Sequence, residues 1–175
     1  MDRYFPSFRI DVLDGEPFDL CSCGVDWGIR NPAAAVLVVR LLSGCYYAVS
    51  EIYERETDAV TFAGMVRRML ELEGVLGCPV WIDASTFNRV DGLFCVAERF
   101  AGVGLNVIPA TRDRKTSMLM IRDLLGGGKL VISPVCRRLI GELRRFGKFS
   151  SSDHAIDALR YAIYPLEVHE CSGVV

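Results

Sequence analysis

The chain has 175 residues, of which 51% are hydrophobic and 24% are charged. This composition fits one globular domain and excludes an intrinsically disordered chain. The formal net charge of −2 gives no reason by itself to expect a nucleic-acid partner. No apolar run approaches the roughly 20 residues that a membrane helix needs. The N-terminal segment lacks the hydrophobic region of a secretory signal, so we expect neither secretion nor a membrane partner.

Seven cysteines are scattered along the chain without the paired spacing of a zinc site. Several lie inside apolar segments, where a free cysteine behaves as a small hydrophobic residue. We therefore expect reduced, structural thiols in a reducing compartment.

The first half of the chain predicts three strands followed by a helix. Residues 1–20 have a mixed pattern that indicates an irregular lead-in or an edge strand. Three apolar or alternating segments then predict strands, with Ser43 and Gly44 forming a hairpin turn between the second and third. After them, apolar residues recur at helical spacing. The expected ranges are 20–26, 33–42 and 45–53 for the strands and 57–73 for the helix.

The second half alternates between short apolar strands and helices. Gly126 to Gly128 end one of these helices, and Pro165 is expected to end the last one. The expected strands are 79–83, 106–110 and 129–133, and the expected helices are 90–101, 116–125, 135–146 and 153–164. An antiparallel three-stranded meander followed by parallel strands, with helices on both faces, is the arrangement of a ribonuclease H-like fold.

Carboxylates follow two of the predicted strands and open the last helix. Asp26 and Asp83 each come at the end of an apolar strand, and they would lie close together if those strands were neighbours. Asp153 and Asp157 share one face of the last helix at i and i+4, and Ser152 is a candidate cap for that helix. Converging carboxylates repel one another unless divalent cations neutralise them, and hard oxygen ligands suit Mg²⁺ or Mn²⁺.

Any single one of these carboxylates could instead have a purely structural role, as a turn or a helix cap. We assign that role to Asp91 and Asp113, which lie near predicted helix starts. Arg160 could simply pair with Asp157 three residues before it. The tyrosines of the last helix, Tyr161 and Tyr164, are interpreted as packing residues.

Three segments together resemble the nuclease domain of viral large terminase subunits, of the tailed-phage or herpesvirus type. The first is C-G-V-D-W-G-I-R-N-P-A-A-A-V (23–36), and the second is V-W-I-D-A-S (80–85). The third and most specific is D-H-A-I-D-A-L-R-Y-A (153–162). The lead-in Y-F-P-S-F-R (4–9) is also similar to the region before the family's first motif.

The resemblance implies a ribonuclease H-like, metal-dependent endonuclease that cuts concatemeric double-stranded viral DNA during genome packaging. It implies that Asp26 bridges two ions, Mg²⁺ or Mn²⁺, and that Asp83 holds one of them. Asp153, Asp157 or both would complete the cluster, and His154 could bind metal or orient water. The resemblance leaves open which residues of this third motif bind metal.

Large terminase subunits also carry an ATPase, but no G-x-x-x-x-G-K-[ST] motif occurs here. We therefore expect residues 1–175 to form a single nuclease domain with a lead-in (1–20) and a tail (166–175). The family implies a packaging ATPase domain, a small terminase subunit and a portal as partners. It also implies a location in the cytoplasm or nucleus of the host cell.

The small net charge hides an uneven distribution. Residues 112–148 contain ten basic and three acidic residues, a formal charge of +7, and the rest of the chain carries −9. Such a basic segment could contact DNA phosphates without reading sequence, or it could be a solvated surface. The candidate DNA-binding residues are Arg112, Arg114, Lys115, Arg137, Arg138, Arg144, Arg145 and Lys148.

Two other functions compete with the nuclease. One is a catalytically inactive domain of the same fold that binds DNA or supports assembly. The other is a fragment of an actin-like or sugar-kinase phosphotransferase, because Asp26-x-Gly28 after a strand resembles a phosphate motif of that superfamily. Those proteins bind nucleotide between two related domains, and 175 residues leave room for only one.

Overall fold

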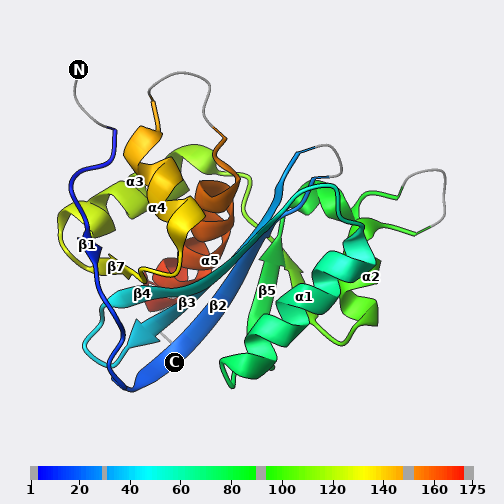
Figure 1. The fold of residues 1–175 in the computed structure, drawn as a ribbon, viewed down its shortest axis with the longest axis horizontal. Helices are drawn as coiled ribbons and strands as arrows, with labels where there is room; N and C mark the ends of the chain where they lie inside the picture. Colours follow the sequence, from blue (N-terminus) through cyan, green and yellow to red (C-terminus); the bar gives the residue numbers. More distant parts are fainter. Residues whose placement is uncertain (1–3, 29–30, 90–93, 148–151, 172–175) are drawn as a thin grey trace.

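The computed structural model describes residues 4–28, 31–89, 94–147 and 152–171. Within these residues one mixed sheet of seven strands has the order β1-β7-β4-β3-β2-β5-β6 (Figure 1). The strands are β1 (Arg9–Ile10), β2 (Phe18–Asp26), β3 (Ala33–Leu41), β4 (Tyr46–Glu54), β5 (Pro79–Ile82), β6 (Asn106–Pro109) and β7 (Leu130–Ile132). The helices are α1 (Ala59–Leu72), α2 (Val96–Gly102), α3 (Arg114–Gly126), α4 (Arg137–Arg145) and α5 (His154–Cys171), with a short 3₁₀ helix, η1 (Ala84–Phe87).

The sheet confirms the predicted ribonuclease H-like arrangement. Strands β2, β3 and β4 form the antiparallel meander, while β5, β6 and β7 add parallel pairings. The lead-in contributes the two-residue edge strand β1, which pairs parallel to β7. Strand β3 lies in the middle of the meander and is apolar along nearly its whole length because both of its faces are covered.

Helices cover both faces of the sheet (Figure 1). Ala34, Val36 and Val38 of β3 pack in one core, with side chains of α3, α4 and α5. The alternate residues Ala35 and Leu37 pack in a second core, with side chains of α1 and the α2 residue Phe100. This period of two places one hydrophobic cluster on each face of the sheet.

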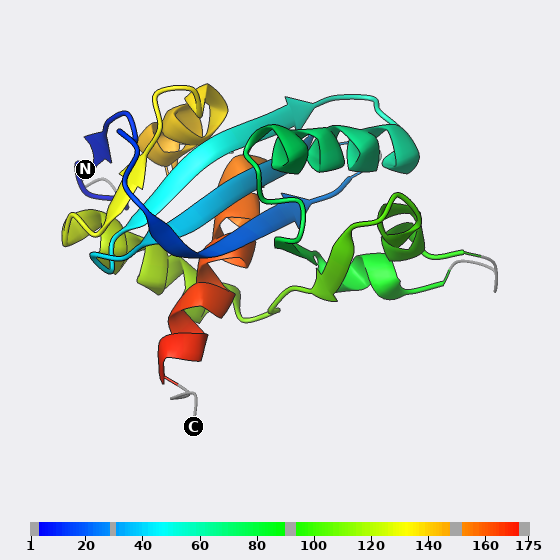
Figure 2. The ribbon, with the colours of Figure 1, turned by 90° about the horizontal axis from the view of Figure 1, so that it is seen from below.

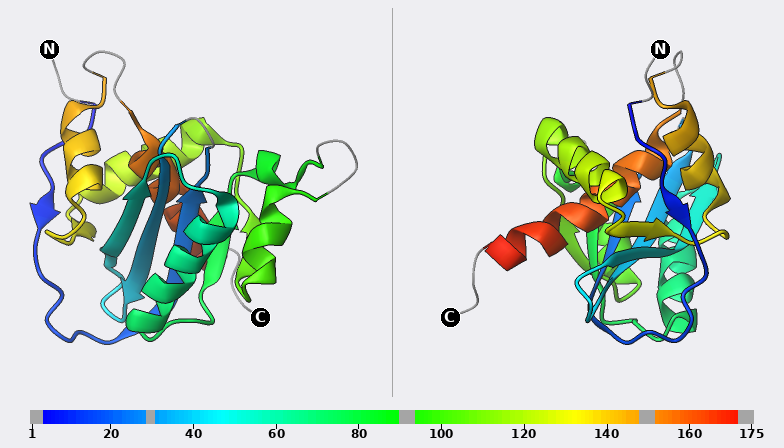
Figure 3. Two further views of the ribbon diagram at one scale, coloured as in Figure 1. Left: turned by 45° about the vertical axis from the view of Figure 1, so that its right-hand side comes forward. Right: turned by 90° about the vertical axis from the view of Figure 1, so that its left-hand side faces the viewer.

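Helix α5 crosses β2 at unusually short range. A Cβ atom placed on Gly24 would lie 1.9 Å from the carbonyl oxygen of Ala158 and 2.6 Å from the amide nitrogen of Ala162. Glycine on the strand and alanines on the helix therefore let the two backbones touch. Figures 2 and 3 show α5 running across the sheet, with its C-terminal turns projecting from the body of the protein. Because Gly24 lies two residues before Asp26, this contact brings the start of α5 to the end of β2.

Some predicted helix boundaries are wrong. Helix α5 continues through Pro165 to Cys171. The proline removes one backbone hydrogen bond of the helix, but Leu166 directly after it is buried, and this burial favours continuation of the helix. Helix α2 begins at Val96, after Cys95, whose backbone N–H donates to Glu98 in a capping box. The predicted start of that helix, residues 90–93, lies outside the described residues. No helix in the described parts of the chain is long and apolar enough to cross a membrane.

Candidate active site

Asp26 and Asp83 lie at the same edge of the sheet. Strands β2 and β5 are parallel neighbours, with Val25 opposite Ile82, which is the pairing that the sequence required for these aspartates to meet. Asp26 is the last residue of β2, and Asp83 directly follows β5. The backbone N–H of Asp83 also donates to the carbonyl oxygen of Val25 at 3.3 Å. Two carboxylates from distant parts of the sequence are thus placed side by side by the strand pairing.

The start of α5 brings His154 to Asp26. The Nδ1 atom of His154 lies 2.7 Å from Oδ2 of Asp26. Both side chains are partly accessible, with exposed fractions of 19% and 17%. The hydrogen bond to Asp26 raises the pKa of His154 above its ordinary value, although partial burial opposes the shift. The contact therefore favours the protonated imidazole when no other cation is present.

Asp83 is held by two donors. Its carboxylate accepts a hydrogen bond from the backbone N–H of Ser85 at 2.7 Å, which caps η1, and another from the Tyr161 hydroxyl at 2.7 Å. Burial alone would raise the pKa of Asp83, but these hydrogen bonds outweigh it and leave the pKa below its ordinary value. Asp83 is therefore kept ionised and fixed in orientation.

Asp153 and Asp157 share a face of α5, and both pair with Arg114 of α3. Asp157 also accepts a hydrogen bond at 2.7 Å from Arg160, which is the i+3 pairing that the sequence allows. Burial raises the pKa of Asp157, although Arg160 opposes the shift. Within the described residues, no three acidic, histidine or cysteine side chains are grouped closely enough to hold a metal ion. The carboxylates of α5 thus face arginines and do not form a compact set of ligands with Asp26 and Asp83.

The candidate DNA-binding residues lie in two places. Arg112 precedes α3, and Arg114 and Lys115 form its first turn, so the helix begins two residues before the expected start at residue 116, because Asp113 caps it through the N–H of Thr116. The four arginines of α4 are all exposed, namely Arg137, Arg138, Arg144 and Arg145. Lys148 lies outside the described residues. A DNA-binding role for these residues stays a prediction.

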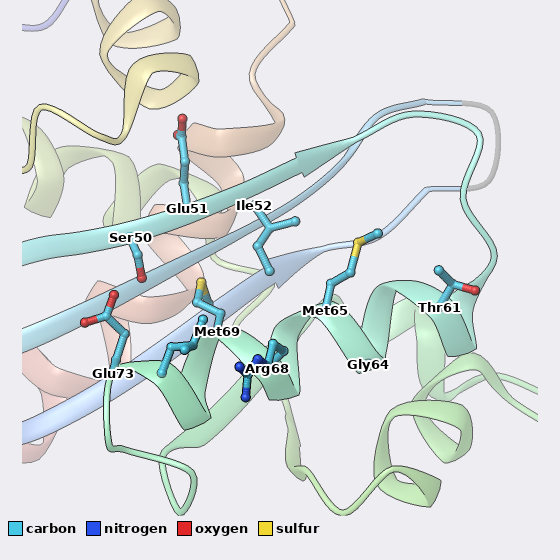
Figure 4. Close-up of a pocket in the computed structure, with 10 residues that line it drawn as sticks. Ser50, Glu51, Ile52, Thr61, Gly64, Met65, Arg68, Met69 and Glu73 are labelled. Carbon is cyan, nitrogen blue, oxygen red and sulfur yellow. The ribbon is translucent and has the colours of Figure 1, made fainter.

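A separate pocket of about 650 Å³ lies between β4 and α1 (Figure 4). Its lining includes Ile52, Met65 and Met69 together with Arg68 and Glu73. None of the predicted site residues lines it. The candidate active site is therefore the edge of the sheet near Asp26 and Asp83, not this pocket.

Sequence patterns alone do not mark two residues near the site as functional. Those patterns predict a packing role for Tyr161, and no sequence signal distinguishes it from Tyr164. Glu142 is 4% exposed and accepts hydrogen bonds from the first turn of α5. It follows Leu139 by three residues and precedes Leu143, so it is an acidic residue within the apolar stripe of an amphipathic helix. That position is a signal that could have found it. Ser152, the expected cap, donates to Glu142 and does not cap α5 itself.

Comparisons with known proteins agree with this geometry. The P22 large terminase nuclease domain superposes with a TM-score of 0.78 at 18% identity, over 95% of this chain and 92% of that one. The nuclease domain of the bacteriophage SPP1 large terminase, solved with bound Mn, gives 0.66 at 18% identity, over 92% and 98% of the two chains. The large terminase of a thermophilic bacteriophage, solved in complex with ADP, gives 0.69 at 19% identity. This chain covers 41% of that ADP-bound terminase, and 87% of this chain is aligned.

At these identities the structural matches establish the fold alone. No curated protein matches the sequence significantly. The sequence model of the family described as the Terminase RNaseH-like domain matches residues 23–165. That range includes Asp26, Asp83 and the whole D-H-A-I-D segment, and it covers most of the chain. The chain therefore belongs to the terminase RNase H-like domain family.

Proposed function

We propose that this protein is a metal-dependent endodeoxyribonuclease that cleaves concatemeric double-stranded DNA during viral genome packaging. The observation that carries the proposal is the meeting of Asp26 and Asp83 at adjacent strand ends, with His154 bonded to Asp26. Membership of the terminase family supports the same reaction. Hydrolysis of a phosphodiester needs charge stabilisation at this edge of the sheet, and the carboxylates are suited to supply it through bound cations.

The donor chemistry fits Mg²⁺ or Mn²⁺. Carboxylate oxygens are the ligands that these hard cations prefer. Asp26 and Asp83 would hold the cations, with Asp153, Asp157 or both completing the set. Cations held there would supply charge stabilisation to the phosphodiester and acidify a water. The Mn bound in the SPP1 nuclease domain supports this choice.

The other residues of the site would orient the carboxylates and water and would balance the negative charge. His154 presents Nδ1 to Asp26, so Nε2 is the atom left to bind a cation or to orient water. Tyr161 fixes the Asp83 carboxylate through its hydroxyl proton. Arg114 neutralises the carboxylates of α5 in the absence of cations. The exposed arginines of α4 would contact DNA phosphates without sequence preference.

The partners and the location are proposed from the resemblance to terminases. We infer that this single nuclease domain works with a packaging ATPase domain, a small terminase subunit and a portal. The large terminase of which this chain covers 41% was solved with ADP, and this supports an ATPase partner. Its place would be the cytoplasm or nucleus of the infected host cell.

Plasmid cleavage tests the proposal. The wild-type protein should nick and linearise plasmid DNA in millimolar-range Mg²⁺ or Mn²⁺, because carboxylate sites that retain water bind Mg²⁺ weakly. EDTA and the substitution Asp26→Asn should each abolish cleavage. Asp14→Asn, at an exposed position, is the control for loss of one carboxylate and should cut normally.

Two outcomes would contradict the proposed nuclease function. Cleavage that survives both EDTA and Asp26→Asn would come from another source. Wild-type protein that binds DNA without cutting it, and without binding Mn²⁺, would be the inactive assembly domain.

A further inference from the structure

The first turn of α5 carries site residues, and its backbone needs an acceptor from elsewhere. The carbonyl oxygen of Asp153 accepts the first helical bond, from the N–H of Asp157 at 2.8 Å, so Asp153 occupies the N-cap position. An aspartate at this position normally accepts the next free N–H groups with its own side chain. Here the Asp153 carboxylate instead pairs with Arg114. The free N–H groups of the first turn would cost free energy if they were buried without partners.

Glu142 of α4 supplies the missing cap. Its Oε2 atom accepts from the N–H of Ala155 at 2.8 Å and of Ile156 at 3.1 Å, which are the second and third residues of α5. Its Oε1 atom accepts from the hydroxyl of Ser152 at 3.3 Å. Glu142 is 4% exposed, so water cannot easily replace these contacts. A carboxylate at this end of a helix is also favoured by the helix dipole.

We propose that Glu142 is a positioning residue of the active site. By capping α5 from a neighbouring helix, it relieves the Asp153 carboxylate of the capping role, so that this carboxylate can pair with Arg114, and it fixes the turn that brings His154 to Asp26. This inference rests on the proposed nuclease function and names a residue that acts through others. Glu142 itself touches neither of the strand-end carboxylates in the described contacts.

The same helix joins the predicted DNA surface to the site. Helix α4 presents exposed arginines on one face and Glu142 on its buried face. The guanidinium of Arg138 lies 5.2 Å from the centre of the Tyr53 ring, and the Tyr53 hydroxyl lies 2.7 Å from the Ser152 hydroxyl. These contacts link an exposed arginine of α4 to Ser152, which donates a hydrogen bond to Glu142.

The test compares Glu142→Ala with Glu142→Gln. Three quantities are measured: Mn²⁺ binding by calorimetry, hydrogen exchange at the amides of Ala155 and Ile156, and plasmid cleavage. Alanine should expose both amides to exchange and weaken Mn²⁺ binding about 10-fold, the lower end of what partners of metal ligands contribute. Glutamine keeps an acceptor oxygen and should restore most of the protection and binding. Asp58→Ala is the control, because Asp58, the N-cap residue of α1 on the other face of the sheet, accepts from the second and third residues of that helix, Val60 and Thr61. It should leave Mn²⁺ binding unchanged.

The outcomes separate this inference from the proposed function. Wild-type protein that neither binds Mn²⁺ nor cuts DNA contradicts the nuclease itself. Wild-type protein that does both, with Glu142→Ala equal to it in Mn²⁺ affinity, contradicts the role of Glu142 alone. If Glu142→Ala does not fold, the wild-type protein and Glu142→Gln together decide. Slow exchange at the Ala155 and Ile156 amides of the wild-type protein, together with near-normal Mn²⁺ binding by Glu142→Gln, supports the cap. Fast exchange at both amides of the wild-type protein overturns it.

Discussion

The two strand-end carboxylates have different partners, and this difference gives them different roles. Asp26 meets an imidazole that can carry a proton, whereas Asp83 receives neutral donors, the Ser85 amide and the Tyr161 hydroxyl. A hydrogen bond to a charged group contributes about 1.5–3 kcal/mol. Tyr161 is therefore more than a packing residue.

Replacing Tyr161 with phenylalanine tests that role. The ring would stay packed, but the hydrogen bond to Asp83 would be removed. We expect Mn²⁺-dependent cleavage to slow about 10-fold, as for other partners of metal ligands, with little change in the melting temperature. Tyr164→Phe on the same helix is the matched control. Equal cleavage rates for the two variants would show that the Tyr161 hydroxyl does not matter to the site.

Glu51 gives a prediction about pH. It accepts from the N–H groups of Arg138 at 2.7 Å and Leu139 at 2.9 Å, at the start of α4. Burial raises its pKa above the ordinary 4.5, although these hydrogen bonds and the Arg138 charge oppose the shift. The folded protein therefore keeps this proton to higher pH than the unfolded chain does. Its contribution to stability falls as pH rises from 4.5 through the folded-state pKa.

Urea denaturation of wild type and Glu51→Gln over that window measures the effect. The wild type should lose stability relative to the variant as pH rises. Glu54→Gln, at the exposed end of the same strand, corrects for the loss of one negative charge. A constant difference between wild type and Glu51→Gln across the window would contradict the raised pKa.

At the scale of elements, the packing of α5 on β2 decides whether the site exists. The helix brings His154 to Asp26 only because its backbone touches that of Gly24. Gly24→Ala would force the helix away, and overpacking of this kind costs about 1–3 kcal/mol or more. We expect a lower melting temperature and loss of cleavage together.

Gly64→Ala is the matched control for that substitution. Gly64 lies inside α1 and has open space at its Cβ position, so alanine there should stabilise the protein by up to about 1 kcal/mol. Thermal unfolding of both variants is the measurement. If Gly24→Ala were as stable and active as wild type, the backbones of β2 and α5 would not be in close contact at Gly24.

Much of the fold was predictable from the sequence because apolar runs and glycine positions are local signals. The meander, the later strands and the placement of Asp26 and Asp83 at strand ends all follow from such runs. The end of α5 was not predictable, because burial of Leu166 outweighs the usual effect of Pro165. The capping by Glu142 and the Tyr161–Asp83 bond depend on tertiary contacts between elements distant in sequence. The D-H-A-I-D segment indicated chemistry, but only the structure shows that Arg114 pairs with both of its aspartates.

For the molecule as a whole, the uneven charge predicts how it would bind DNA. The segment 112–148 carries +7 against −9 elsewhere, so phosphate contacts should concentrate there. Removing one phosphate-binding side chain makes the slope of log affinity against log salt shallower by about 0.9. The double substitution Arg144→Ala with Arg145→Ala should therefore make the slope shallower by about 1.8.

Fluorescence anisotropy with duplex DNA at several salt concentrations measures that slope. Arg68→Ala with Arg99→Ala is the control, because these exposed arginines lie on α1 and α2, across the sheet from α4. An unchanged slope for the α4 variant, or an equal change in both variants, would place the DNA surface elsewhere.

We propose that Asp26 and Asp83 form the core of a divalent-metal site. Anomalous scattering from a crystal soaked in Mn²⁺ tests it most directly. We predict peaks within bonding distance of both carboxylates, with the remaining ligands drawn from Asp153, His154 and Asp157. A crystal of cleavage-competent protein with no Mn²⁺ at these two carboxylates would show that they do not hold the metal.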